Sequence, residues 1–273
     1  GKTAGANFDI APFNRRRCIL TDGGTPLAYY GESGYTETGA LTQQIVKGGV
    51  TYPIGTKVQV MVEQHKFYYR VVPLLIEPIS GGKGYHLRKA RYYISATQKE
   101  GMKLHKAFNV NGVQKDYIYL SAYEGSLYDT SALAYILNDE QVADFNADKM
   151  CSIANAKPMS GLTQSLTRAN ARKLAQNRGS GWQQQYIDTV SLSQMLFMIE
   201  YASFNSQTAI GLGVVSKTDD GTTNMAVNTG ATSSLGNASG MASGTNGLVS
   251  VTYRGEENFW GNIWKWVDGI NIY

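Results

Sequence analysis

The stretch RGEENFWGNIWKWVDGI, residues 254–270, carries most of the chain's tryptophan shortly before the last residue. Three of the four tryptophans lie in it: Trp260, Trp264 and Trp266. In an extended strand, Asn262 would share one face with the last two tryptophans, and Ile263 and Val267 would share the other. Large apolar side chains on both faces are typical of a segment that is covered on both sides. We therefore expect the stretch to pack in the centre of the fold; the alternative is an aromatic platform that contacts a ligand.

The composition of the 273-residue chain is that of a folded protein. Hydrophobic residues make up 42% and charged residues 17%, which is enough apolar material for the core of one or two domains. No apolar run approaches the roughly 20 residues that a membrane-spanning helix needs. The net charge of +4 is scattered, and its densest cluster, RRR at residues 15–17, is too small for a nucleic-acid surface. We expect neither nucleic-acid binding nor membrane insertion, and the absence of an initiator Met predicts a processed chain.

The first 125 residues have the pattern of a β-rich region. Residues 1–48 are rich in glycine, threonine and polar residues, which predicts turns between short strands. Residues 58–79 and 81–95 are dense in β-branched and aromatic residues, which predicts strands. In residues 115–125, tyrosines alternate with Ile118 and Leu120, as expected for a strand with two unlike faces.

Helical patterns follow after this β-rich region. Residues 138–149 predict a short helix, and residues 165–179 predict a second one with Gly179 as its C-cap. Residues 182–211 hold the longest helical pattern in the chain. The tract 216–247 is rich in small polar residues and glycine, so we expect it to be ordered by packing on a neighbouring subunit or another virion protein rather than by its own domain. The alternative is a mobile surface loop.

Cysteine and histidine do not form a recognisable metal or catalytic motif. His65, His86 and His105 are each isolated, so a transition-metal site is not expected. Cys18 and Cys151 are separated by most of the chain and fit no disulfide framework. We predict that both are buried free thiols in a protein made in a reducing compartment.

Other polar motifs are equally weak as evidence for catalysis. The turn GGKGYHLRK, residues 81–89, lacks the residues of a phosphate loop. Asp139, Glu140 and Asp144 would form the solvated face of a short helix rather than an acid–base pair. TDDGTTN, residues 218–224, has oxygen ligands without the full spacing of a calcium loop. We expect a protein that is not an enzyme and needs no cofactor, with bound calcium as the alternative.

The segment FWGNIWKWVDG resembles the G-N-x-W-x-W motif of the C-type-lectin-like fold, in the branch shared with formylglycine-generating enzymes. In that branch the motif packs the domain centre, which implies a structural role for five residues here. These are Trp260, Gly261, Asn262, Trp264 and Trp266. We expect the amide of Asn262 to bond neighbouring backbone. Neither cysteine lies in a context that matches the formylglycine-generating chemistry.

Longer phrases of the sequence resemble tail-associated minor structural proteins of gut bacteriophages, several of which are variable proteins of diversity-generating retroelements. The phrases are VMVEQHKFYYRVVPL, GYHLRKARYYIS, KDYIYLSAYEGSLYD, GLTQSLTRANARKLAQNRGSGWQQQY and YRGEENFWGNIWKWVDGINIY. The resemblance implies an α+β fold with a β-rich N-terminal module, residues 1–105, and a C-type-lectin-like module, residues 106–273. Such relatives continue into a second lectin half, so we expect this chain to be a fragment or to lack that half.

The function implied by this resemblance is that of a non-catalytic virion protein of the tail tip or tail fibre. It would present a host-receptor-binding surface and would be made in the cytoplasm of the bacterial host. Its partners would be other tail proteins, a glycan or protein receptor, and further copies of itself, with a homotrimer favoured. A structural scaffold or collar component without its own ligand is the first alternative. A virion-associated polysaccharide hydrolase is the second.

Overall fold

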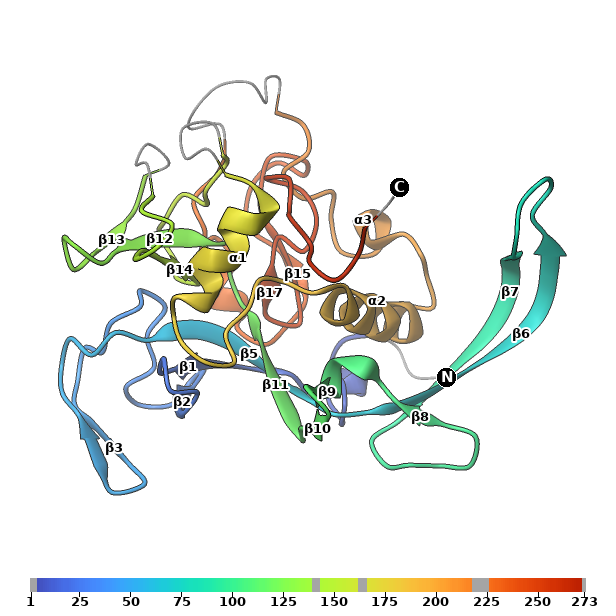
Figure 1. Ribbon diagram of the computed structural model, residues 1–273, viewed down its shortest axis with the longest axis horizontal. Helices are drawn as coiled ribbons and strands as arrows, with labels where there is room; N and C mark the ends of the chain where they lie inside the picture. The colour runs from blue at the N-terminus through green and yellow to red at the C-terminus, as the bar shows by residue number, and fades with distance from the viewer. Residues whose placement is uncertain (1–3, 139–142, 162–165, 218–225, 272–273) are drawn as a thin grey trace.

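A computed structural model describes residues 4–138, 143–161, 166–217 and 226–271 (Figure 1). The fold is β-rich with few helices, as expected for the α+β class. Short antiparallel sheets and the helices form one body, and the hairpin β6–β7 projects from one end of it (Figure 1). None of the helices in the described ranges combines the length and the apolar character needed to cross a bilayer.

The central sheet has four antiparallel strands in the order β11-β5-β1-β2. Their bounds are Tyr117–Ser121, Gln59–His65, Arg16–Leu20 and Pro26–Tyr29. Strand β5 is buried from Gln59 to Gln64 because β1 and β11 pair on its two edges and both of its faces are covered. Strand β5 precedes the predicted module boundary between residues 105 and 106 in the sequence, and β11 follows it. The central sheet therefore contains strands from both predicted modules, and the division into two modules stays a prediction.

The remaining strands form small antiparallel sheets around this one. They are β3 (Ile45–Lys47) with β4 (Val50–Tyr52); β6 (Tyr68–Pro78) with β7 (Tyr85–Ser95) and β8 (Lys103–Leu104); β9 (Asn109–Val110) with β10 (Val113–Gln114); β12 (Ser126–Asp129) with β13 (Ala134–Ile136) and β14 (Lys149–Cys151); and β15 (Gly240–Met241) with β16 (Val251–Tyr253) and β17 (Glu256–Glu257). Three short 3-10 helices are η1 (Ala6–Phe8), η2 (Lys106–Phe108) and η3 (Ser233–Leu235).

Helix α2, Ile187–Tyr201, supplies one wall of the main core. Its buried Leu192, Leu196 and Phe197 pack with aromatic residues from distant parts of the chain. The helix is shorter than the predicted 182–211 because Tyr186 is extended and Ala202 adopts a left-handed conformation that ends it. Helix α3, Ser206–Ala209, follows as a separate turn.

Helix α1, Arg168–Gln176, confirms the prediction of a helix within residues 165–179. Thr167 caps it by accepting a hydrogen bond from the backbone N–H of Asn170. The helix ends at Gln176 and its C-cap is Asn177, so the predicted C-cap at Gly179 is wrong. The predicted helix at 138–149 lies partly outside the described residues, and its described part, residues 143–149, is a turn leading into β14 because Asp148 bonds back to the N–H of Asp144.

The first half of the opening stretch is the buried half. Arg254 pairs with Glu200 of α2 at 2.6 Å, and Glu256 accepts hydrogen bonds from Arg15 and from Ser193. Both arginine side chains and both carboxylates are buried. The buried Arg17 and Glu257 and the partly buried Glu37 extend this cluster. We call it the buried polar cluster and define it as Arg15, Arg17, Glu37, Glu200, Arg254, Glu256 and Glu257.

Gly255 allows the Arg17 side chain to pack directly against the backbone of this cluster. Its φ is +90°, a region that favours glycine, and a Cβ there would lie 3.2 Å from atoms of Arg17 and Val62. The guanidinium of Arg17 donates to the carbonyl oxygen of Gly255 at 2.9 Å, so the backbone itself serves as a partner for the buried cation. A side chain at this position would separate the two.

The described part of the tract 216–247 packs on the body of its own chain. Thr229 and Thr232 are buried, and Glu257 accepts hydrogen bonds from the N–H groups of Gly230 and Thr232. The amide oxygen of Asn237 accepts from the backbone N–H of Arg17 at 2.7 Å. The prediction that this tract is ordered only by a neighbouring subunit is therefore wrong for the described residues. Small polar side chains fit here because their hydrogen bonds satisfy buried partners.

Cys18 and Cys151 are buried free thiols, as predicted. Burial raises the pKa of each to about 12, so both stay protonated near neutral pH. Arg178 donates to the sulfur of Cys151 at 3.0 Å and also pairs with Asp22. The compartment in which the protein is made stays a prediction.

The hairpin β6–β7, which we call the arm, carries apolar side chains that its own body does not cover. Ile76 and Leu87 face each other across the two strands, and Leu74, Leu75 and Tyr85 are exposed as well. Pro73 lies at a register shift in β6, where its missing N–H does not interrupt a regular ladder. Strand β8 pairs with the base of the arm, at Tyr68 and Tyr69.

The buried His105 predicts a loss of stability in mild acid. It lies among Phe67, Tyr69 and Phe108, and burial lowers its pKa to about 4 from 6.5, against the opposing charge of Asp188. Its Nδ1 accepts a hydrogen bond from the N–H of Ala107, which requires the neutral ring. Because the pKa of His105 is lower in the folded state than in the unfolded state, the neutral ring contributes about 3 kcal/mol to the unfolding free energy above pH 6.5. This contribution is lost as the pH falls from 6.5 towards 4.

Denaturant unfolding at pH values from 7 to 4 measures this contribution. In His105→Phe, which keeps an aromatic ring in the cluster, the decline of unfolding free energy between pH 6.5 and 4 should be smaller than in the wild type by about 3 kcal/mol. Carboxylates titrate in both proteins, so the difference between them isolates the histidine. Identical pH dependence in the two proteins would contradict the prediction.

Candidate functional site

The tryptophans at the end of the opening stretch are exposed. Trp264 is 92% exposed and Trp266 is 50% exposed, so the prediction that they pack in the centre of the fold is wrong. Strand β17 ends at Glu257, and Asn258, Gly261 and Asn262 all have positive φ. These left-handed residues turn the chain repeatedly, so the two-face alternation of a strand does not apply to the segment that follows.

Trp260, Gly261 and Asn262 have the structural role expected of them. Trp260 packs against the main core and its Nε1 donates to the carbonyl oxygen of Gly211 at 3.1 Å. A Cβ on Gly261 would lie 2.9 Å from the backbone nitrogen of Val214. The amide of Asn262 accepts from the N–H of Val227 at 2.9 Å and donates to Glu124 at 2.5 Å, which confirms its predicted use in securing neighbouring backbone.

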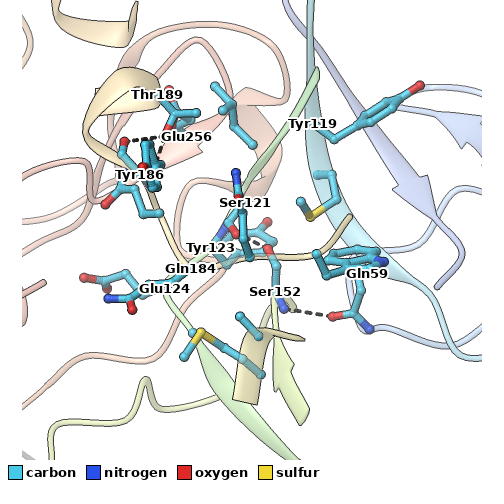
Figure 2. Close-up of a pocket in the computed structure, with 18 of the residues that line it drawn as sticks. Gln59, Tyr119, Ser121, Tyr123, Glu124, Ser152, Gln184, Tyr186, Thr189 and Glu256 are labelled. Carbon is cyan, nitrogen blue, oxygen red and sulfur yellow. Dashed lines mark hydrogen bonds between the residues drawn. The ribbon is translucent and has the colours of Figure 1, made fainter. Parts of the chain in front are cut away.

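The exposed tryptophans border a cavity of about 530 Å³, which we call the aromatic cleft. Its wall combines strand β11, the loop 180–186 before α2 and the segment 256–266 (Figure 2). The aromatic residues that line it are Tyr117, Tyr119, Tyr123, Trp182, Tyr186, Phe259, Trp264 and Trp266. One side of the wall is aliphatic and contains Met150, Met159, Leu166, Ala171 and Ala175. The volume lies in the range of small-molecule binding sites.

All five residues of strand β11 line the cleft. Ile118 and Leu120 also pack with the main core, whereas Tyr119 packs with a separate cluster of Cys18, Leu20 and Met61. The two unlike faces predicted for residues 115–125 are therefore confirmed. The hydroxyl of Tyr119 donates to Glu63 at 3.2 Å, and burial raises its pKa.

Gln184 is a buried polar residue of the cleft wall whose amide oxygen has neither a hydrogen bond nor an ion pair among the described residues. It is 5% exposed, and its Nε2 donates to the carbonyl oxygen of Trp266 at 2.6 Å. Its Oε1 has no hydrogen-bond partner within the described parts of the chain. A buried acceptor without a partner costs free energy, and a ligand donor that reaches this oxygen would recover it.

The carboxylates of the cleft wall are already engaged. Glu124 accepts from Asn258 and Asn262 and forms an ion pair with Lys265 at 2.8 Å. Glu256 and Glu257 belong to the buried polar cluster, and burial raises the pKa of Glu257 against the hydrogen bonds from Thr232 and Gly230. These interactions hold the three glutamate side chains in fixed positions in the cleft wall. Groups that can bind a ligand include the exposed aromatic faces, the unpartnered amide oxygen of Gln184, and the exposed Lys115 and Ser121.

The residues singled out as possible sites from their sequence context are not brought together. His65 lies at the end of β5, His86 is exposed on the arm and His105 is buried beside α2. Asp144 caps a turn by accepting from the N–H of Asn146. Residues 139 and 140 and the possible calcium loop 218–224 lie outside the described residues. Within the described ranges, no three His, Cys, Asp or Glu side chains gather as a set that could hold a metal ion.

Several cleft residues are not indicated by the predicted helix of residues 182–211. Its first residues, 182–186, form an irregular segment that lines the cleft. Three consecutive amides between two aromatic residues are the signal that could have indicated a binding segment. No known protein family, no curated protein and no solved structure matches this chain.

The different surroundings of Trp260, which is partly buried against the core, and of the exposed Trp264 give a direct prediction. Trp264→Ala should change the unfolding free energy by less than about 0.5 kcal/mol, because the indole contacts mainly solvent. Trp260→Ala should lower it by about 3 kcal/mol, because the ring packs on the core and its Nε1 bonds Gly211. Thermal or denaturant unfolding of the two variants measures both effects. A strongly destabilised Trp264→Ala would restore the interpretation of this residue as core.

Proposed function

We propose that this chain is a non-catalytic host-attachment protein of a bacteriophage tail, and that the aromatic cleft is its receptor-contacting surface. The exposed Trp264 at the border of the cleft is the observation that carries the proposal. Exposed aromatic surface is a common mark of an interaction site in a folded protein. The phage assignment itself rests on the resemblance of the longer sequence phrases to tail-associated proteins.

The side chains of the cleft suit recognition better than catalysis. Glu124, Glu256 and Glu257 accept hydrogen bonds from fixed donors, so their orientation serves the wall of the cleft. A glycoside hydrolase would need an acid and a base or nucleophile directed at one bond. The engagement of these three carboxylates favours attachment over the hydrolase alternative.

A C-type-lectin-like module within residues 106–273 belongs to this proposal. The structural use of Trp260, Gly261 and Asn262 supports it, because these residues start the motif that packs the centre of that fold. The exposure of Trp264 and Trp266 departs from the motif's packing role. In the proposal, these two rings have a ligand-contacting role instead.

Cell adsorption tests the attachment function. Fluorescently labelled protein is incubated with a panel of intact gut bacteria, and bound protein is measured by flow cytometry. We expect binding to at least one strain and at least a tenfold loss for Trp264→Ala. Phe204→Ala is the matched control, because Phe204 is 84% exposed but does not line the cleft, and it should bind as the wild type does. Binding that survives the loss of Trp264, or the absence of binding to every strain, would refute the proposal.

Assembly into a tail structure is the second candidate function, and the arm is the observation that favours it. Residues 68–95 contain five Lys or Arg and one Glu, a net charge of +4 that equals the charge of the whole chain. The rest of the chain therefore carries 20 charges of each sign. A two-stranded ribbon with exposed apolar side chains is marginally stable alone and gains from a partner surface.

A second copy of the chain is the partner that we propose for the arm. Two arms would repel each other because both are cationic, whereas the body of a neighbouring copy has no net charge. Each arm would then pack on the neighbour's body, and the closed arrangement with three copies is the trimer that the resemblance implies. This contact would cover Leu75, Ile76 and Leu87.

Sedimentation velocity over a range of concentrations tests the assembly role. Ile76→Thr with Leu87→Thr removes a cross-strand apolar pair while keeping residues that favour strands. The wild type should form oligomers and this variant should sediment as a monomer with an unchanged melting temperature. Val46→Thr with Val50→Thr, on the exposed hairpin β3–β4, is the control and should assemble normally. A monomeric wild type, or equal assembly of the arm variant, would contradict the role of the arm.

A further inference from the structure

We infer that the aromatic cleft binds an uncharged saccharide that carries an acetamido group, that is, an N-acetylhexosamine. The inference rests on the proposed function, because it names the chemistry of the receptor that the cleft would recognise. Three features of the cleft lead to it: its exposed indole rings, the pairing of its charges, and an unpartnered acceptor in a cavity with an aliphatic side.

The exposed indole rings favour a sugar ring over other polar ligands. Trp264 is almost fully exposed and Trp266 is half exposed, and both border the same cavity. A pyranose has a face of C–H groups that packs on an aromatic ring, while its hydroxyl groups remain free for hydrogen bonds. A tryptophan pair at the border of a polar cleft therefore provides a stacking surface for one or two sugar rings.

The pairing of charges in the cleft favours an uncharged sugar. Lys265 lies 2.8 Å from Glu124, which neutralises the cation closest in sequence to the tryptophans. Glu256 pairs with Arg15, and Glu257 accepts from Thr232 and Gly230. Lys115 also lines the cleft, but it is exposed ahead of β11, where solvent and salt screen its charge. An acidic sugar would bring a carboxylate or phosphate to a wall that offers it no dedicated cation.

The unpartnered Oε1 of Gln184 favours an acetamido substituent. This oxygen needs a donor, and the amide N–H of an acetamido group is one. The methyl of the same group needs apolar contacts, which Met150, Met159 and Ala171 supply in the same cavity. A hydroxyl at the same sugar position would donate a hydrogen bond but leave the aliphatic side without a partner. The acetamido group uses both features.

Matched pairs of monosaccharides test the inference. The methyl glycosides of N-acetylglucosamine, N-acetylgalactosamine and N-acetylmannosamine are each compared with the glycoside of the parent hexose, which has a hydroxyl in place of the acetamido group. Saturation-transfer NMR gives binding and competition, with the methyl glycoside of N-acetylneuraminic acid, which keeps its carboxylate, as the acidic sugar. We expect at least one acetamido sugar to bind about five- to tenfold more tightly than its parent, the effect of a hydrogen bond to a buried acceptor. The acidic sugar should not compete.

Two variants separate the contributions of the cleft residues. Trp264→Ala should abolish binding of both members of a pair, because the stacking surface is common to them. Gln184→Leu should bring the two affinities close to equality, because the acceptor is lost, and this ratio is unaffected by a general weakening of the site. Phe204→Ala should leave both affinities unchanged.

Each other outcome overturns a defined part of the inference. Equal affinity within all three pairs would contradict recognition of the acetamido group. Competition by the acidic sugar would contradict the requirement for an uncharged ligand. If no sugar binds while adsorption to cells still depends on Trp264, the saccharide inference fails and the attachment function stands. If neither sugar binding nor Trp264-dependent adsorption occurs, both fail.

Discussion

The buried ion pair between Arg15 and Glu256 is the constraint on which the rest of the structure depends. Two charges removed from water are tolerated only when nearly every donor and acceptor is used. Arg15 accordingly also donates to Gln64 of β5 and to Ser193 of α2, and Ser193 donates to Glu256. The N-terminal segment, the central sheet, the long helix and the C-terminal segment must all be in place for this pair to form. Such a cluster couples regions that are more than 200 residues apart.

The same buried polar cluster determines how the aromatic cleft is presented. Glu256 and Glu257 hold β17 in the interior, and the chain then turns outwards at Asn258, Gly261 and Asn262. Trp260 packs that turn against the core, and the residues that follow line the same cleft as the loop before α2. The carbonyl oxygen of Trp266 then receives the amide of Gln184. The site is therefore built by a rigid interior, while its contact groups lie at the surface.

The sequence predicted the elements whose structure depends on residues close together in the chain. The strand positions around β5, β6, β7 and β11, the helix α1 and the buried thiols followed from periodicity, capping and composition. The outward position of Trp264 could not be predicted, because it depends on left-handed backbone at Asn258 and Asn262 and on a buried charge cluster formed by distant residues. Gln184 was missed for a similar reason, since its role appears only when the loop before α2 meets the C-terminal segment. A tryptophan-rich stretch is equally compatible with a core and with a surface until the backbone that carries it is known.

The two inert cysteines make the protein suitable for labelling at chosen positions. Both thiols of the chain are buried and, with pKa values of about 12, they are poor nucleophiles in the folded state. A cysteine introduced at Ser80, in the exposed turn of the arm, would then be the only accessible thiol in the native protein. A dye attached there would report where the arm lies relative to a neighbouring subunit, and a dye near the cleft would report ligand binding, without first removing a native residue.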